Sequence, residues 1–315
     1  MGDILFSSIE KLHGTRLWGK FLDAGTGLHS LKWVQTLATT SWTAITADHH
    51  MKSQIQIDSN VSSRMRPVDR LLVGNWMDEK FCQTLGQYDT ILADYLIGAV
   101  DGFSPYEQDT IIRKLSNHLL PNGRLYFIGM NPIPDEHDPP GSIISEIRRA
   151  RDSCILLAGH RPYREFPLSW MKRHIESSGL VITSSRNFTI LHSEDSALRQ
   201  IKVARSKLDY MANPALQEGM KQYLNDLEER TRKTVRAHGK IPLSYDYVIA
   251  AEKLPTTVLD FANNPKNTME GRSVPTSSEE HDHNHDGEHD HDHGKSDGDI
   301  ESAKGHSDEA ADHHH

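Results

Sequence analysis

The residues best placed to do chemistry are a glycine-rich turn and the acidic residues that end short apolar segments. The turn lies in KFLDAGTGLHSLKW, residues 20–33, where Asp23 is followed by Gly25 and Gly27. The acids that end the next three apolar segments are Asp48, Asp78 and Asp94. Glycine lets backbone N–H groups approach a ligand closely, and the start of a helix adds partial positive charge. The pattern therefore predicts a ligand site built on backbone and carboxylates.

Two classes of cofactor compete for this turn. A nicotinamide site requires G-x-G-x-x-G/A followed by an acid about 20 residues later. Residues 25–30 nearly fit, with Ser30 as the third small residue and Asp48 placed to bind a ribose. Asp23 disfavours that interpretation, because a carboxylate just before the first glycine would repel a pyrophosphate. The same carboxylate would attract a ligand that carries an amino group.

A second cluster, HRPYREF, lies at residues 160–166. Arg161 and Arg164 could bind a carboxylate, Tyr163 lies between them, and His160 could act as a base. The alternative is that arginines on an irregular segment are solvated or pair with the acids at residues 135–138. The sequence predicts a substrate-binding loop here and leaves that alternative open.

We predict no metal site in the folded body. Asp94 and Asn131 could belong to a metal-assisted site, but a second aspartate beside Asn131 is missing. The C-terminal tail differs, because six histidines alternate with carboxylates there: His281, His283, His285, His289, His291 and His293. Imidazoles bind zinc, nickel or copper. Their repetitive spacing predicts a loose chelator, so a divalent metal is an expected partner of the tail.

Predicted strands and helices, which would position these residues, alternate along the chain before the tail. Apolar, strand-like segments and stretches with helical periodicity follow one another from residue 20 to residue 130. Such alternation indicates crossover connections, hence a mostly parallel sheet with helices on both faces. Ligands bind such sheets at the carboxyl ends of the strands, where the aspartates fall. We also predict a helix from Ser104 as N-cap, with Pro105 first and Glu107 completing a capping box, to about Leu120.

Two insertions and a tail complete the organisation. Helical insertions are expected at about 131–167 and 193–239, and Asn213 before Pro214 predicts a helix start. We assign residues 1–254 to one domain and residues 255–315 to a disordered linker and His/Asp-rich tail. Residues 279–312 contain 13 acids and two lysines, so the chain's net charge of −9 comes from the tail. The nearly neutral body gives no electrostatic case for a nucleic-acid surface.

The turn and its setting resemble the first motif of the class I S-adenosylmethionine-dependent methyltransferases. In that motif an apolar strand ends in an acid and continues x-Gly-x-Gly, as FLDAGTG does here. The resemblance extends over about Lys20 to Lys253, through strand order and motif placement. It implies a Rossmann-like α/β fold with a seven-stranded, mostly parallel sheet. Its antiparallel last strand would be SYDYVIAAEK, residues 244–253.

The resemblance also implies roles for individual residues, with S-adenosylmethionine as the cofactor. Gly25, Thr26 and Gly27 would line its methionine part, and Asp23 would contact its amino group. The remaining implied contacts are Asp48 with the ribose hydroxyls, Met77 and Asp78 beside the adenine, and Asp94 with Tyr95 facing the reactive centre. The sequence departs from the motif at His29, where the family often has a third glycine.

The resemblance implies an S-adenosylmethionine-dependent methyltransferase (EC 2.1.1 class). The segment after the fourth strand, residues 93–98, lacks the Asp/Asn/Ser-Pro-Pro-aromatic loop of enzymes that methylate nucleic-acid amino groups. The paired-glutamate hairpin of arginine methyltransferases is not recognisable either, so the resemblance points by elimination to a small-molecule or unassigned substrate, and we predict a small molecule. The alternatives are an NAD(P)-dependent oxidoreductase and a non-catalytic protein with a metal-chelating tail.

The sequence also bears on the compartment. The two cysteines, Cys82 and Cys154, are far apart and form no Cys-x-x-Cys pair, which suits a reducing compartment. No apolar run approaches the roughly 18 residues of a membrane helix, and the N-terminus has no secretory pattern. We expect a cytoplasmic protein with no membrane partner.

Overall fold

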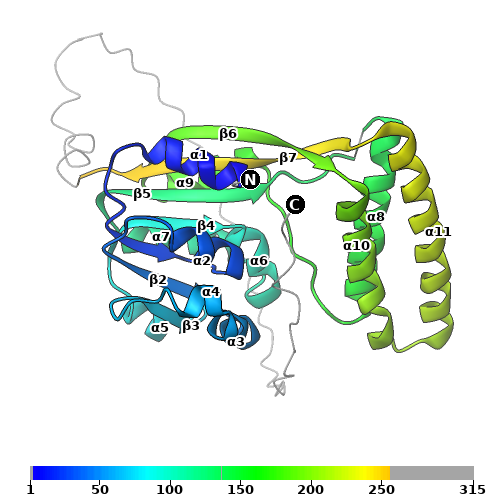
Figure 1. The fold of residues 1–315 in the computed structure, drawn as a ribbon, viewed down its shortest axis with the longest axis horizontal. Coiled ribbons are helices and arrows are strands. Elements are labelled where there is room, and N and C mark those ends of the chain that lie inside the picture. The colour runs from blue at the N-terminus through cyan, green and yellow to red at the C-terminus, as the bar shows by residue number, and fades with distance from the viewer. Residues whose placement is uncertain (1–2, 136, 256–315) are drawn as a thin grey trace, which may run out of the picture. The chain divides into compact units, whose positions relative to one another are not determined.

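The computed structural model describes residues 3–135 and 137–255, so the predicted linker and histidine-rich tail lie outside the described residues. The described chain contains one mixed sheet in the order β3-β2-β1-β4-β5-β7-β6 (Figure 1). Its strands are β1 (Lys20–Asp23), β2 (Ser41–Thr46), β3 (Arg70–Val73), β4 (Tyr88–Asp94), β5 (Leu119–Met130), β6 (Leu180–His192) and β7 (Ile241–Lys253). Strands β1 to β5 pair in parallel, and β7 runs antiparallel to both β5 and β6. The predicted Rossmann-like α/β fold is confirmed, including the antiparallel last strand.

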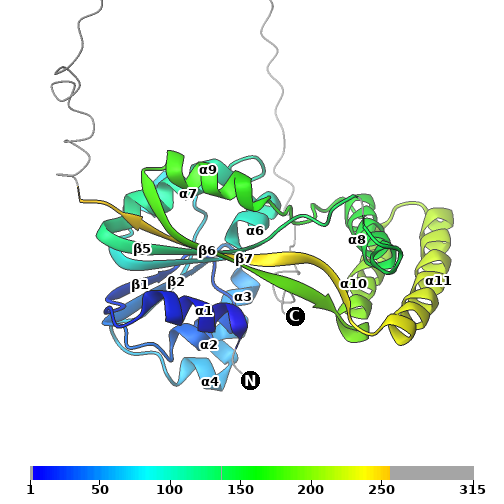
Figure 2. The same cartoon turned by 90° about the horizontal axis from the view of Figure 1, so that it is seen from above.

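Helices cover both faces of this sheet (Figure 2). One face packs against α1 (Ile4–His13), α2 (Leu28–Val34), α3 (His49–Ile57) and α4 (Ser59–Ser62). The other packs against α5 (Glu79–Gln83), α6 (Leu96–Phe103), α7 (Gln108–His118) and α9 (Leu168–Ser177). Burial on both faces explains why the central strand segments, residues 21–22 of β1 and 91–93 of β4, are continuously apolar rather than alternating.

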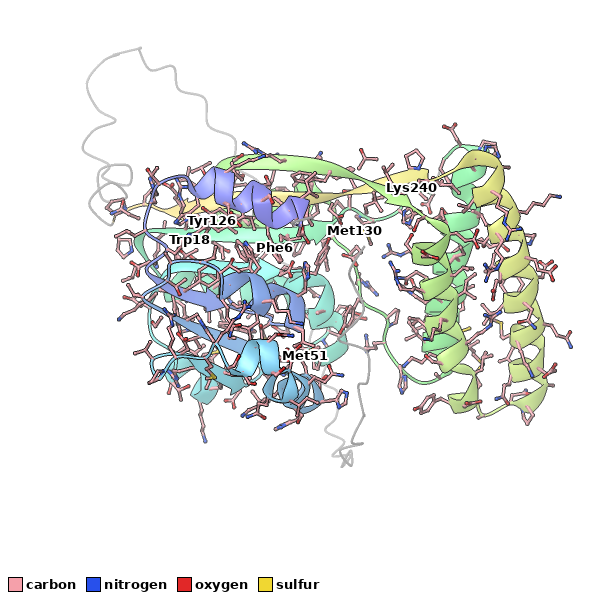
Figure 3. All side chains as sticks on the ribbon, viewed as in Figure 1. Phe6, Trp18, Met51, Tyr126, Met130 and Lys240 are labelled. Carbon is pink, nitrogen blue, oxygen red and sulfur yellow. The ribbon has the colours of Figure 1, made fainter. Side chains whose placement is uncertain are left out.

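Neighbouring residues of the central strands enter opposite hydrophobic clusters. On β5, Phe127 packs with α6, α7 and α9, whereas Tyr126 packs with α1 and α2, and both rings are fully buried. Tyr126 and Trp18, both labelled in Figure 3, lie next to each other with ring centroids 6.3 Å apart. The Tyr126 hydroxyl is 2.9 Å from Nδ1 of His13. These contacts fix the strand register, because a slip by one residue would turn each side chain to the wrong face.

The helical insertions after β5 and β6 form a third hydrophobic cluster. It comprises α8 (Pro139–Leu157), α10 (Glu194–Ser206), the 3₁₀ turn η1 (Leu208–Tyr210) and α11 (Pro214–His238). Figures 1 and 2 show these helices side by side beyond the ends of β6 and β7. The predicted cap is confirmed, since the Asn213 side chain accepts hydrogen bonds from the backbone N–H groups of Ala215 and Leu216.

One predicted helix start is wrong. The helix expected from Ser104 begins at Gln108, and Tyr106 has a left-handed backbone with φ of 72°. Ser104 instead closes α6, and its hydroxyl bonds to the side chain of Asn75 at 3.1 Å. The local capping pattern is overridden because α6 occupies residues 96–103 and the chain must turn before α7. No helix among the described residues is long and apolar enough to cross a membrane.

Candidate functional site

The glycine turn is held between β2 and β4. The backbone N–H of Ala24 donates to Leu92 O at 2.9 Å, and that of Thr26 donates to Ile45 O at 2.7 Å. A Cβ on Gly25 would come within 2.8 Å of the terminal methyl of Leu96, so a larger residue there would require the Leu96 side chain to shift. A Cβ on Gly27 would meet nothing within 4 Å, although Gly27 lines the main pocket. The open side of the turn therefore faces the pocket.

His29, the departure from the family motif, points away from this pocket. Its Nε2 lies 2.8 Å from Asp3 Oδ2, and its ring stacks on Phe6 at 5.1 Å between centroids. The third small position is taken by Ser30, whose Oγ accepts from the Gly27 N–H at 3.1 Å. The imidazole therefore takes no space from a ligand at the turn.

Two carboxyl groups lie close to the glycine turn, the buried Asp23 and the half-buried Asp94. Asp23 is fully buried; its Oδ2 accepts from Ser30 Oγ at 2.8 Å, and its Oδ1 finds no hydrogen-bond partner among the described residues. Burial raises the pKa of Asp23 to about 6. Burial, and then the charge of Asp23, raise the pKa of Asp94 well above its ordinary value. A positively charged ligand group would stabilise both carboxylates.

The main pocket brings together most of the predicted site. The predicted residues that line it are Gly25, Thr26, Gly27, Asp48, Asp94, Tyr95 and Tyr163. Asp23 lies directly before this turn and outside the lining. Asp48 caps α3 by accepting from the His50 N–H at 2.7 Å through Oδ1, while lining the pocket. Four strand ends thus contribute to one site, as the parallel sheet predicts.

Tyr95 adopts an unusual backbone where β4 passes into α6. Its φ of 46° is left-handed, and its N–H donates to Ile128 O at 3.0 Å. Burial, and then the neighbouring carboxylate of Asp246, raise the pKa of the Tyr95 phenol well above its ordinary value. A non-glycine residue held this way costs about 1–3 kcal/mol, and such strain clusters at functional sites.

Met77 and Asp78 do not line the pocket. Asp78 instead caps α5, accepting from Lys80 N at 2.9 Å. The segment after β3 reaches the pocket through the residues just before them, Asn75 and Trp76. The indole N–H of Trp76 donates to Ala24 O at 2.7 Å, which ties this segment to the glycine turn.

The predicted substrate loop is divided between the pocket and the surface of α6. Tyr163 lines the pocket, whereas Arg161 and Arg164 lie 4.0 and 3.9 Å from the carboxylate of Asp101 on α6. His160 lies outside the pocket lining, with its ring 5.3 Å from that of Tyr210. Both arginines thus pair with an acid. That acid is Asp101, whereas the sequence had suggested the acids at residues 135–138.

The sequence interpretation missed several pocket residues: Gly74, Asn75, Trp76, Phe103 and Ser104. Two of them could have been found from their position, because Gly74 and Asn75 directly follow β3 at the carboxyl end of the strand. The six tail histidines lie outside the described residues. Within residues 3–135 and 137–255, no three metal-ligating side chains gather into a candidate metal site.

Replacing Asp23 by asparagine is expected to stabilise the unliganded protein near neutral pH. The folded-state pKa of about 6 exceeds the usual 3.8, so the folded state holds the extra proton and its stability falls as pH rises from about 4 to 6. Asparagine removes the buried charge and keeps an acceptor for Ser30. The melting temperature of Asp23→Asn should exceed that of the wild type at pH 7.5 and match it near pH 4. Asp109→Asn, at an exposed site on α7, should change neither, and equal behaviour of both variants would contradict this account.

Comparison with known proteins identifies similar folds but no similar sequence. No protein-family model matches the chain, and no curated protein matches it. The structure of a "putative methyltransferase" from Bacillus halodurans C-125 covers 81% of this chain and 100% of its own, at 11% identity and a TM-score of 0.53. The YcgJ protein from Bacillus subtilis covers 79% and 97%, at 16% identity and 0.46. Phosphoethanolamine N-methyltransferase 2 from Haemonchus contortus, in complex with S-adenosyl-L-methionine, covers 79% and 52%, at 9% identity and 0.43.

Identities this low show the fold alone, and the two TM-scores below 0.5 carry no argument. The first match confirms the predicted resemblance to the class I methyltransferases at the level of fold. The assignment of a reaction therefore rests on the pocket.

Proposed function

We propose that this protein is an S-adenosylmethionine-dependent methyltransferase that acts on a small molecule. The carrying observation is the placement of two carboxyl groups at the glycine turn: Asp94 lines the pocket, and the buried Asp23 directly precedes the turn. S-Adenosylmethionine carries a sulfonium and an ammonium group, which suit two carboxylates that otherwise repel each other. The pyrophosphate of a nicotinamide cofactor would add negative charge to the same place, so the pocket disfavours that alternative.

The described residues fit this cofactor in three places. Gly25, Thr26 and Gly27 would accommodate the methionine part, and the buried carboxyl of Asp23, directly before the turn, would attract its ammonium through charge. Asp48, with Oδ1 capping α3, would bind the ribose hydroxyls. The adenine would lie near Asn75 and Trp76, in place of the predicted Met77 and Asp78.

Methyl transfer from S-adenosylmethionine does not require a particular catalytic side chain. The bound cofactor supplies a methyl group on sulfur, which is already a good leaving group. The protein must align the acceptor with that methyl and exclude water. Tyr95 lines both the main pocket and the cavity beside it, so we place the reacting atoms at its side. His160 lies outside both cavities, and we assign it no catalytic role.

S-Adenosylhomocysteine is expected to stabilise the folded protein. At about 100 times its dissociation constant, a ligand adds about 2.7 kcal/mol to the free energy of unfolding. For a domain of this size, that corresponds to a rise of roughly 5–10 °C in melting temperature. Thermal denaturation with S-adenosylhomocysteine, NAD and NADP in parallel checks this. A rise with NADP and none with S-adenosylhomocysteine would reject the methyltransferase in favour of the oxidoreductase.

A further inference from the structure

A second cavity adjoins the main pocket where the sheet meets the helical insertion. Tyr95 and Tyr163 line both spaces, so a molecule in the second cavity would reach the wall of the main pocket. Met130, labelled in Figure 3, lies at the end of β5 where the chain leaves for α8, and it lines this cavity. The remaining lining comes mainly from α8 and α10. The cavity therefore lies where the acceptor of a transferred methyl group would have to bind.

Arg148 on α8 lines this cavity and forms no short ion pair with a described residue, although the carboxyl of Glu165 acts on it through charge. Its side chain is 19% exposed, and the only ion pair recorded for it is a long one, with Nε 3.8 Å from Asp152 Oδ2. No hydrogen bond from its guanidinium to another described residue is found. Burial lowers the pKa of Arg148, as expected for a cation taken out of water. A buried cation is costly unless it is paired and hydrogen-bonded.

Arg151, one turn along the same helix, shows the opposite situation. Its Nε and Nη2 donate to Asp152 Oδ1 at 3.0 and 2.8 Å, and its Nη1 donates to Gln200 Oε1 at 2.6 Å. Asp152 thus accepts its hydrogen bonds from Arg151. The guanidinium N–H groups of Arg148 therefore remain available to a ligand. A planar guanidinium with free donors matches the two oxygens of a carboxylate or phosphate.

The rest of the cavity defines the other parts of a ligand. Ile133, Ile144 and Ile147 provide an apolar wall. Glu165 is the carboxyl group among the described lining residues, and it packs against Gly98 on α6. Burial raises the pKa of Glu165 to about 7, so at neutral pH it is partly uncharged and opposes an anion less than an ordinary glutamate would. The lining therefore combines an apolar surface with a cationic end.

We propose that the second cavity binds the methyl acceptor and that the acceptor is a small organic anion. Its carboxylate or phosphate group would pair with Arg148, its apolar part would lie against the isoleucines of α8, and its reacting atom would face Tyr95. This inference rests on the proposed function, but the anion site itself can be tested without cofactor. It also replaces Arg161 and Arg164, which pair with Asp101, as the substrate-binding arginines.

The test uses four six-carbon probes with one head group each: hexanoate, hexyl phosphate, hexylamine and hexanol. Titration calorimetry on the full chain should show binding of at least one of the two anions and neither hexylamine nor hexanol. Hexanoate alone would identify a carboxylate acceptor, and hexyl phosphate alone a phosphorylated one. Equal binding of hexanol, or preference for hexylamine, would overturn the proposal.

Arg148→Gln should weaken anion binding by roughly tenfold or more, because a charge-assisted contact is lost. Arg148→Lys should retain part of it. Arg149→Gln is the matched control, since the neighbouring Arg149 is 69% exposed and lies 4.0 Å from Asp135. Unchanged anion affinity in Arg148→Gln would overturn the proposal, provided that its melting temperature shows a folded protein.

The outcomes separate this proposal from the proposed function. S-Adenosylhomocysteine binding without Arg148-dependent anion binding would reject the anion site and keep the methyltransferase. Arg148-dependent anion binding without S-adenosylhomocysteine binding would keep the anion site and reject the methyltransferase.

Discussion

Replacing Gly27 by alanine is expected to leave the protein folded and to remove most of its affinity for S-adenosylhomocysteine. A Cβ at this position meets no protein atom within 4 Å, so it would project into the space that the pocket leaves beside the turn. An extra methyl in a close-packed site costs about 1–3 kcal/mol, which corresponds to roughly 5- to 150-fold in affinity. Titration calorimetry of wild type and variant measures this loss directly.

Gly86 provides the control for that substitution. A Cβ there also meets nothing within 4 Å, and Gly86 does not line the pocket. Gly86→Ala should change neither the melting temperature nor the affinity. Gly27 also caps α2, so a small loss of stability in Gly27→Ala is expected from the cap alone. Full affinity in Gly27→Ala would mean that the cofactor does not approach this turn.

Replacing Asp48 by alanine is expected to produce the second large loss of affinity. Asp48 lines the pocket while its Oδ1 caps α3. If the carboxylate binds the ribose hydroxyls, at least one charge-assisted hydrogen bond worth about 1.5–3 kcal/mol is lost. The dissociation constant for S-adenosylhomocysteine should rise by at least roughly 10- to 150-fold.

Asp78→Ala separates binding from capping, because Asp78 caps α5 as Asp48 caps α3. Each variant should lose about 1 kcal/mol of stability through the cap. Only Asp48→Ala should lose affinity, since Asp78 lies outside the pocket lining. Equal losses of affinity in both variants would restore the predicted contact of Asp78 with adenine and would weaken the role given to Asn75.

The sheet and its glycine turn could be predicted from the sequence because their signals are local. Strands β1 to β4 are short segments rich in apolar residues, the connections between β1 and β5 contain helices, and Asp23, Gly25 and Gly27 stand together at one strand end. The helix start at Ser104 could not be predicted, because its capping pattern is local whereas the turn there is imposed by α6. Residue spacing alone did not show that Asn75, rather than Asp78, lines the pocket.

The roles of the arginines were even harder to predict from residue spacing. Arg161 and Arg164 stand out in the sequence as a basic cluster, but a buried acid on α6, about 60 residues earlier, pairs with both. Arg148 and Arg149 are neighbours on α8, yet one lines the cavity and the other is exposed. Which side of α8 is buried depends on α10, some 50 residues later in the chain. Such long-range packing leaves no signal in the spacing of the arginines themselves.

The most direct test of the central claim is titration calorimetry of wild type and Gly27→Ala with S-adenosylhomocysteine and with NADP. The account predicts one-site binding of S-adenosylhomocysteine to the wild type, a large loss of that binding in Gly27→Ala, and no binding of NADP to either. Binding of NADP that Gly27→Ala abolishes, with no binding of S-adenosylhomocysteine, would contradict the claim and make the pocket a nicotinamide site.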